Sequence, residues 1–400
     1  MRWRRTAVVS AAMAVAVAAL TGPVAPASAG SPVTSAPSSA RTAPADSPRG
    51  PSAQAAALVA EMTTAEQAAS IVMGHIGGTD PAALRDYMAG GFGGFILMGG
   101  NIPDTEADLR ALTAALTVDA SLPPLIAVDQ EGGIVSRLDG DDFPASTTLK
   151  GRPVAETASA FAARASLVAR AGITVNFGTV ADVTADRQSF IHGRALGTDP
   201  ASAAERVTAA TAAQEPLLGS TLKHFPGHGA APGDSHSAIP RTPMSLDAWR
   251  SADAVPFRAG IDAGASLLMF GHLAYTAVDA APATMSAAWH EIARDELGFD
   301  GVIVTDDLGM LLSSGVAEYA DPVANAVTAV AAGNDLVLTI AGSTAATAGD
   351  MAAGIAAAVE SGVVTPERLA EAATRVMTLR LELSSATSAW TVCAECEPVE

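Results

Sequence analysis

The segment Lys223–His236, with the sequence KHFPGHGAAPGDSH, gathers residue types that bind ligands and move protons. It holds three of the seven histidines of the chain, and its three glycines and two prolines exclude a regular helix or a central strand. Lys223 is one of only two lysines in a chain that otherwise uses arginine as its cation. Because an ammonium group is a compact point donor, we expect Lys223 to bind a ligand.

The histidines of this segment are compatible with more than one chemistry. His224 and His228 have the i, i+4 spacing of metal-binding helices, but the glycines and the proline around them prevent that helix, so we expect no metal. Asp234 and His236 are spaced i, i+2, which places both side chains on one side of an extended loop. The carboxylate could then orient the imidazole as a general acid and base, or it could cap a backbone amide in a turn.

Other carboxylates follow apolar runs. Asp306 follows the run GVIVT, where an aspartate could attack the anomeric carbon of a sugar or cap the next helix. Asp307 must point to the opposite side of a strand, and we assign the helix cap to it. Asp129, Glu131 and Arg137 surround a Gly-Gly turn, and side chains of these types at a pocket rim can bind hydroxyl groups.

Eight short apolar runs alternate with helix-like stretches, which predicts a single (β/α)8 TIM-type barrel of the α/β class. The runs are continuously apolar, as strands covered on both faces should be. A doubly wound open sheet is the alternative, but the chain has no dinucleotide fingerprint. In a barrel, the polar residues named above lie at the carboxyl ends of strands, where active sites form. The eight runs are ASIVMGHI, GGFILMGG, PPLIAVDQ, ITVNFGTVADV, STLKHF, SLLMFGHLAY, GVIVTDDL and NDLVLTIAG.

The termini indicate export. The chain begins with a basic segment, an apolar run and a small-residue cleavage site, as a secretory signal peptide does, so we expect a secreted, extracellular protein with no membrane span after cleavage. Cys393 and Cys396 could form a small disulfide loop outside the cell, or they could be a tail pair without a catalytic role. The predicted segments are a signal peptide at 1–29, a disordered Ser/Pro/Ala-rich linker at 30–52, the barrel at 53–383 and a tail with the CxxC pair at 384–400.

The composition argues against one class of partner. Lys and Arg number 23 against 42 Asp and Glu, which gives a formal net charge of −19. An acidic surface repels phosphate backbones, so we expect no nucleic-acid partner.

Taken together, these motifs resemble glycoside hydrolase family 3 and, within it, the bacterial β-N-acetylglucosaminidase branch. The resemblance covers about residues 55–383, and it is carried by VDQEGG with Arg137 following, KHFPGHG with DSH at the matching spacing, DAVPFRAGIDAGA, GVIVTDDLGM and AVAAGNDLVL. It implies a retaining two-step hydrolysis of terminal β-linked N-acetylglucosamine in cell-wall or chitin-derived oligosaccharides. No cofactor is implied, and we expect a monomer whose partner is its carbohydrate substrate.

The resemblance also implies roles for individual residues. Asp306 matches the nucleophile of the family, and His236 matches the acid/base of this branch, with Asp234 as its dyad partner. Sugar-binding roles carry over to five residues, which are Asp129, Arg137, Arg194, Lys223 and His224.

Two positions depart from the branch. Ile134 stands where arginine often follows the Gly-Gly pair, and Thr305 stands where serine is common. The sequence therefore does not determine the shape of the pocket rim near Ile134. We also expect no second α/β domain after the barrel, which agrees with an acid/base supplied by the barrel itself.

Three other functions remain compatible with the sequence. A neutral histidine does not repel phosphate, so an N-acetylglucosaminide phosphorylase is one alternative. A family 3 β-glucosidase is another. A barrel that binds sugar without cleaving it is the third, although Asp306, Asp234 and His236 are all present.

Overall fold

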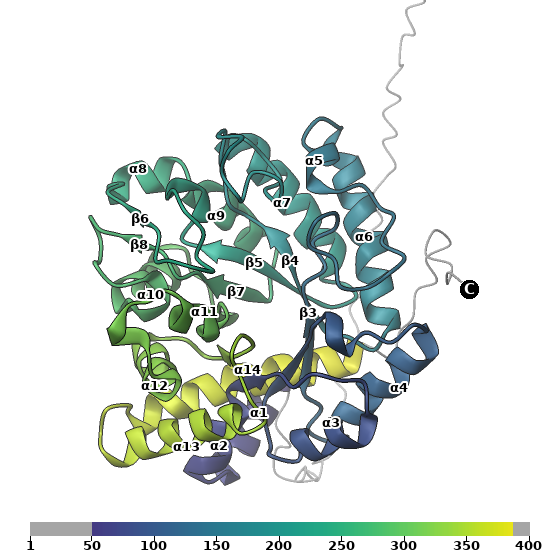
Figure 1. The fold of residues 1–400 in the computed structure, drawn as a ribbon, viewed down its shortest axis with the longest axis vertical. Helices are drawn as coiled ribbons and strands as arrows, with labels where there is room; N and C mark the ends of the chain where they lie inside the picture. The colour runs from purple at the N-terminus through teal and green to yellow at the C-terminus, as the bar shows by residue number, and fades with distance from the viewer. Residues whose placement is uncertain (1–49, 387–400) are drawn as a thin grey trace, which may run out of the picture. The chain divides into compact units, whose positions relative to one another are not determined.

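The computed structural model describes residues 50–386, which form a ring of eight parallel strands surrounded by helices (Figure 1). The hydrogen-bonded order is β10-β1-β2-β3-β4-β5-β7-β9, and a parallel bridge between Val304 and Leu336 brings the two outer strands together. This arrangement confirms the predicted (β/α)8 barrel and excludes the open sheet. The barrel strands are β1 (Val72–Gly74), β2 (Gly94–Leu97), β3 (Leu125–Val128), β4 (Val175–Val180), β5 (Gly219–Phe225), β7 (Leu267–Phe270), β9 (Val302–Thr305) and β10 (Val337–Leu338).

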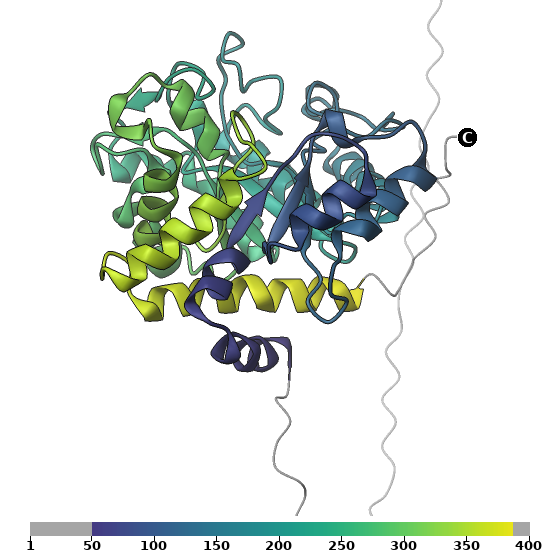
Figure 2. The same cartoon turned by 60° about the horizontal axis from the view of Figure 1, so that its bottom comes forward.

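The helices cover the outside of the strand ring, and the long helix α14 crosses one end of it beside α1 (Figure 2). Many helices begin at a side-chain cap, as when Thr105 accepts from the amide of Asp108 at 3.1 Å or Thr365 from that of Arg368 at 3.1 Å. The helices are α1 (Pro51–Glu61), α2 (Thr64–Ser70), α3 (Pro81–Met88), α4 (Glu106–Leu116), α5 (Ser146–Leu149), α6 (Val154–Arg170), α7 (Pro200–Gln214), α8 (Leu246–Ser251), α9 (Ala254–Asp262), α10 (Ala287–Glu291), α11 (Leu308–Ser313), α12 (Pro322–Ala332), α13 (Thr347–Glu360) and α14 (Pro366–Ala386).

Each of the eight apolar runs contains a barrel strand, but the sixth run divides in two. Its first half is β7, and its second half is β8 (Ala274–Tyr275), which leaves the barrel and pairs in parallel with β6 (Arg241–Thr242). Between them lies His272, a fully buried ring whose nitrogens contact the Thr284 hydroxyl and the Asp307 carbonyl, each at 2.8 Å. These contacts hold the chain where it turns out of the ring.

The ends of the barrel differ slightly from the predicted boundaries. Helix α1 already begins at Pro51, two residues before the predicted start, and α14 continues to Ala386, three residues past the predicted end. The predicted signal peptide, most of the linker, and the cysteines at 393 and 396 lie outside the described residues. Within residues 50–386, no helix is both long enough and apolar enough to cross a bilayer.

A cluster of aromatic residues packs beside β5. Phe225 lies 5.3 Å from Phe257, 5.7 Å from Trp289 and 5.9 Å from Trp249, measured between ring centroids, and each of these pairs is nearly edge to face. Tyr275 joins the group through Trp289, at 5.2 Å. Edge-to-face pairs at these separations are favourable, so a dense aromatic cluster supports the strand that carries Lys223 and His224.

A buried carboxylate ties the outer helices to the last barrel strands. Asp335 is fully buried just before β10, and it forms ion pairs with Arg368 and Arg375 of α14 and with Arg294 of the π-helical turn Ile292–Glu296. It also accepts a hydrogen bond of 3.0 Å from the amide of Ile303 in β9. Removing one member of a buried ionic network leaves the others uncompensated.

We therefore expect Asp335→Ala to lower the free energy of unfolding by about 3–5 kcal/mol, because three guanidinium groups lose their shared partner. Chemical denaturation followed by circular dichroism would measure the change. Asp350→Ala, at an exposed position of α13, is the matched control and should change stability little. Equal stabilities of the two variants would contradict this account.

Candidate active site

The predicted ligand-binding residues meet at the carboxyl ends of the strands. Asp129 directly follows β3, and Lys223 lies near the end of β5. The ammonium of Lys223 is only 2% exposed and lies 3.0 Å from Asp129 Oδ1 and 2.7 Å from Glu131 Oε1. Its charge is therefore balanced by two carboxylates.

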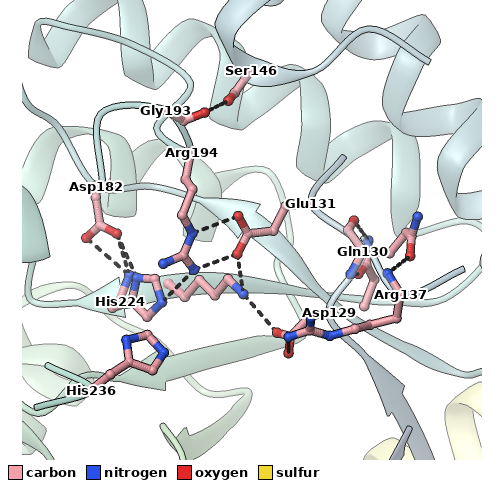
Figure 3. A network of polar contacts seen from close by, with 12 residues as sticks. Asp129, Gln130, Glu131, Arg137, Ser146, Asp182, Gly193, Arg194, His224 and His236 are labelled. Atoms are coloured by element: carbon pink, nitrogen blue, oxygen red, sulfur yellow. Dashed lines mark hydrogen bonds and ion pairs between the residues drawn. The ribbon is translucent and has the colours of Figure 1, made fainter. Parts of the chain in front are cut away.

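A second set of contacts continues from Glu131. Arg194 holds this carboxylate with two hydrogen bonds, of 2.9 Å from Nε and 2.7 Å from Nη2 (Figure 3). The same Nη2 lies 3.3 Å from His224 Nε2, and His224 Nδ1 lies 2.7 Å from Asp182 Oδ2. The result is one connected network from Asp129 to Asp182.

Electrostatics keep this network charged. Burial disfavours ionisation of Asp129 and Glu131, but the cations Lys223 and Arg194 together outweigh it, with Arg137 adding to the effect on Asp129, and the pKa of both carboxyls lies below the usual value. Burial alone would lower the pKa of Lys223, yet the same two carboxylates raise it above its usual value. Lys223 is thus a fixed cation at the floor of the site.

His224 is neutral in this setting. Burial and then the charge of Arg194 hold its pKa well below the usual value. Asp182 also accepts hydrogen bonds from the backbone amides of His224 at 3.2 Å and of His228 at 2.6 Å. Because a carboxylate accepts, His224 Nδ1 donates to Asp182, and its Nε2 is the acceptor that faces Arg194.

The turn after β3 positions Arg137. Gly132 and Gly133 adopt φ values of 89° and 76°, which glycine allows without strain, and the chain reverses there. The side chain of Gln130 accepts from the amide of Arg137 at 2.9 Å, which fixes the returning strand of the turn. The guanidinium of Arg137 then lies 3.4 Å from Asp129 Oδ2, at the edge of the network.

The loop that follows β5 is anchored at its start. Trp249 Nε1 donates to the carbonyl of Pro226 and Tyr275 Oη to that of Gly227, both at 2.7 Å. Gly229 packs on Val183 so closely that a Cβ would lie 1.8 Å from the Val183 carbonyl oxygen, so only glycine fits there. The peptide bonds Lys223–His224 and Phe225–Pro226 are both cis.

The Asp234–His236 pair lies on the exposed half of the same loop. Asp234 Oδ1 is 2.6 Å from His236 Nδ1 and also accepts from the amide of His236 at 3.0 Å. The segment is a turn, so the predicted extended geometry is wrong. Both contacts predicted for Asp234 are nevertheless present, because the same carboxylate oxygen caps the turn and contacts the imidazole.

Asp306 and Asp307 make different contacts, and the helix cap predicted for Asp307 is confirmed. Asp307 caps α11 by accepting from the amide of Gly309 at 2.9 Å, and it also accepts from the amides of Ile340 and Ala341. Asp306 directly follows β9 and accepts from the amide of Asp307 at 2.8 Å. Burial opposes its ionisation, but the neighbouring imidazoles of His224 and His272, the amide of Asp307 and the ammonium of Lys223 together hold the pKa of Asp306 below the usual value.

The structure therefore brings all five predicted sugar-binding residues into one network, namely Asp129, Arg137, Arg194, Lys223 and His224. Asp306 lies close enough for the charge of Lys223 to influence its pKa. The hydrogen bonds of the Asp234–His236 pair stay within its own loop. Sequence reasoning missed Asp182 and gave too little weight to Glu131. Asp182 does follow an apolar strand, as Asp129 and Asp306 do, and that position could have identified it. Among residues 50–386, no three His, Cys, Asp or Glu side chains are arranged to hold a metal ion.

A further carboxyl packs beneath the loop. Asp253, just before α9, is 4% exposed, and its Oδ1 has no hydrogen-bond partner among the described residues. A Cβ on Gly227 would lie 2.7 Å from this oxygen, so the carboxyl touches the loop backbone. Burial, together with the charge of Asp182, raises the pKa of Asp253 to about 7.

This shift predicts a pH-dependent stability. Between about pH 4 and 7 folded Asp253 keeps a proton that the unfolded chain has released, so the free energy of unfolding falls as the pH rises through this window. Asp253→Asn cannot titrate, and its stability relative to the wild type should rise by about 2–4 kcal/mol from pH 4.5 to pH 7.5. Denaturation at a series of pH values would measure this difference.

Asp262→Asn, at the exposed end of the same helix, is the control and should follow the wild-type curve. Parallel pH curves for the Asp253 variant and the wild type would refute a protonated Asp253.

Comparison with known proteins places the chain among carbohydrate-active enzymes. Residues 64–379 match the family model described as "Glycosyl hydrolase family 3 N terminal domain". The chain is 39% identical over 263 residues to a beta-hexosaminidase of Chromobacterium violaceum, an alignment that covers 62% of this chain and 71% of that protein. It is 38% identical over 253 residues to a beta-hexosaminidase of Pseudomonas aeruginosa, covering 62% of this chain and 74% of that protein.

Comparison with solved structures agrees with these sequence matches. The fold matches a glycoside hydrolase family 3 beta-N-acetylglucosaminidase from Paenibacillus sp. str. FPU-7 with a TM-score of 0.76 and 29% identity, covering 83% of this chain and 64% of that chain. This chain therefore spans less than two thirds of the Paenibacillus enzyme. A beta-N-acetylhexosaminidase from Beutenbergia cavernae matches with a TM-score of 0.70 and 27% identity, covering 80% of this chain and 99% of that chain.

Proposed function

The chain belongs to glycoside hydrolase family 3, and we propose that it is an exo-acting, retaining β-N-acetylglucosaminidase. Its substrates in this proposal are oligosaccharides from cell walls or chitin that end in β-linked N-acetylglucosamine. The names of its relatives support the choice of sugar, because they are beta-hexosaminidases and beta-N-acetylglucosaminidases.

One observation carries the mechanism: Asp306 is held in its ionised form at the carboxyl end of β9, beside the charges of the binding network. An ionised carboxylate there can attack the anomeric carbon while the glycosidic C–O bond breaks. The product of this step is a glycosyl ester on Asp306. The amide of Asp307, which donates to Asp306, and the ammonium of Lys223 favour the anion before the attack.

The Asp234–His236 dyad supplies the proton. With Nδ1 bonded to Asp234, the protonated imidazole offers Nε2–H to the departing glycosidic oxygen. The neutral Nε2 then accepts a proton from the water that attacks the anomeric carbon, and the Asp306 carboxylate leaves. The dyad ends in its starting protonation state, so the two steps balance.

The binding network holds the sugar at the reacting position. Asp129 offers a carboxylate acceptor for a hydroxyl, while Lys223 and Arg137 offer donors. Arg194 and His224 are braced by Glu131 and Asp182, so they can position a sugar without rearranging. We propose that the enzyme acts outside the cell, where the predicted signal peptide would direct it.

The first test follows cleavage of an aryl N-acetyl-β-glucosaminide by the wild type and by Asp306→Asn. We expect the variant to lose roughly 10³-fold or more in kcat, because the covalent intermediate cannot form. Asp300→Asn, at the exposed opposite end of the same strand, is the matched control and should keep full activity.

Product analysis separates the alternatives. Release of a sugar 1-phosphate only with added phosphate would mark a phosphorylase. Cleavage of an aryl β-glucoside in preference to the acetamido sugar would mark a β-glucosidase. A folded wild type that binds N-acetylglucosamine but cleaves neither aryl glycoside would overturn the hydrolase mechanism in favour of a binding role.

A further inference from the structure

Phe190 stands between the binding network and the dyad. Its ring lies 4.6 Å from that of His228 and 6.5 Å from that of His236, between centroids, and both pairs are edge to face. The guanidinium carbon of Arg194 lies 6.0 Å from the same ring centroid. One side chain therefore contacts the rigid network and the imidazole on the exposed loop.

The segment that carries Phe190 is fixed independently of the loop. The hydroxyl of Ser146 donates to the carbonyl of Gly193 at 2.7 Å, and the ammonium of Lys150 donates to the carbonyl of His192. Phe190 itself packs against a small buried cluster formed by Val180, Ile191 and Ala195. Its position thus does not depend on where the loop lies.

His228, the nearer ring partner of Phe190, is also held in place. His228 is 1% exposed, and burial lowers its pKa, so it faces Phe190 as a neutral ring. Neither of its ring nitrogens has a hydrogen-bond partner among the described residues. Its backbone amide is bonded to Asp182 at 2.6 Å, which places the ring.

The dyad lacks comparable support of its own. The side chains of His236 and Asp234 are 63% and 47% exposed, and their hydrogen bonds join residues of the same turn. Asp234 therefore fixes the rotation of the imidazole, but it does not fix the imidazole relative to the barrel. Proton transfer also needs the constraint that the imidazole is fixed relative to the barrel, because donor and acceptor must lie within hydrogen-bond reach.

We propose that Phe190 is a positioning residue that provides this constraint, as the fixed surface against which the His236 ring rests while Nε2 faces the glycosidic oxygen. This inference rests on the proposed function, since it assigns His236 the acid/base role. Phe190 does not touch the reacting atoms, and in this role it acts through the imidazole of His236. Its loss should weaken proton transfer and leave nucleophilic attack by Asp306 intact.

Leaving-group dependence separates these two effects. A 2,4-dinitrophenyl aglycone departs without a proton, whereas a phenyl or methylumbelliferyl aglycone needs one. For Phe190→Ala we expect kcat/KM to fall by about 10-fold or more on the poorer leaving groups and by about 2-fold or less on the dinitrophenyl glycoside. His236→Ala should show the same pattern with a larger loss.

Two further variants keep the test decisive. Phe190→Leu retains apolar volume but removes the ring, and we expect it to show the same selective loss. Val363→Ala, at an exposed apolar position in the turn between α13 and α14, is the control and should match the wild type on every aglycone. Activity on the dinitrophenyl substrate also reports that each variant is folded.

A Phe190→Leu enzyme that loses the same factor on all aglycones, or loses nothing, would overturn the positioning role alone. A wild type that cleaves none of the aryl N-acetyl-β-glucosaminides would instead overturn the proposed function. The two failures are therefore distinguishable in one set of measurements.

Discussion

The need to balance the buried ammonium of Lys223 organises the site. A cation that is 2% exposed requires carboxylates, and Asp129 and Glu131 supply them. Glu131 in turn requires the guanidinium of Arg194, which reaches His224. Desolvation makes such arrangements poor sources of stability, so a chain of alternating charges at the mouth of a barrel indicates selection for binding rather than for folding.

This constraint separates the site into two parts with different physical character. The floor is a preorganised set of donors and acceptors, each held by a neighbour on another strand, and it can bind a hydroxylated ligand without reorganisation. The dyad proposed to transfer the proton stands apart on an exposed turn, where solvent can reach it. The proposed mechanism benefits from this separation, because the imidazole must meet both a leaving group and an incoming water.

The sequence predicted the parts of the molecule that local chemistry determines. Continuous apolar runs located all eight strands, and side-chain alternation assigned the helix cap to Asp307. What the sequence could not show was long-range pairing. The role of Asp182 depends on its contact with His224, 42 positions along the chain, and Phe190 lies in an irregular segment where no periodicity marks its neighbours. The turn at Asp234 also escaped prediction, because i, i+2 spacing fits both a turn and an extended loop.

Both ends of the loop that carries the dyad converge on one short strand. Tyr275 of β8 holds the Gly227 carbonyl at the beginning of the loop, and its backbone pairs with Thr242 of β6 just past its end. The entropy of closing this loop is therefore lost when β8 packs against Gly227 and β6. This cost arises from fixing the two ends of the loop, and it does not depend on the sequence of the residues between them. Since closure entropy grows only with the logarithm of loop length, the exposed half can gain or lose residues at small cost to folding. The fold thus allows the reach of the proposed acid/base to diversify among descendants of this chain while the buried charged network stays unchanged.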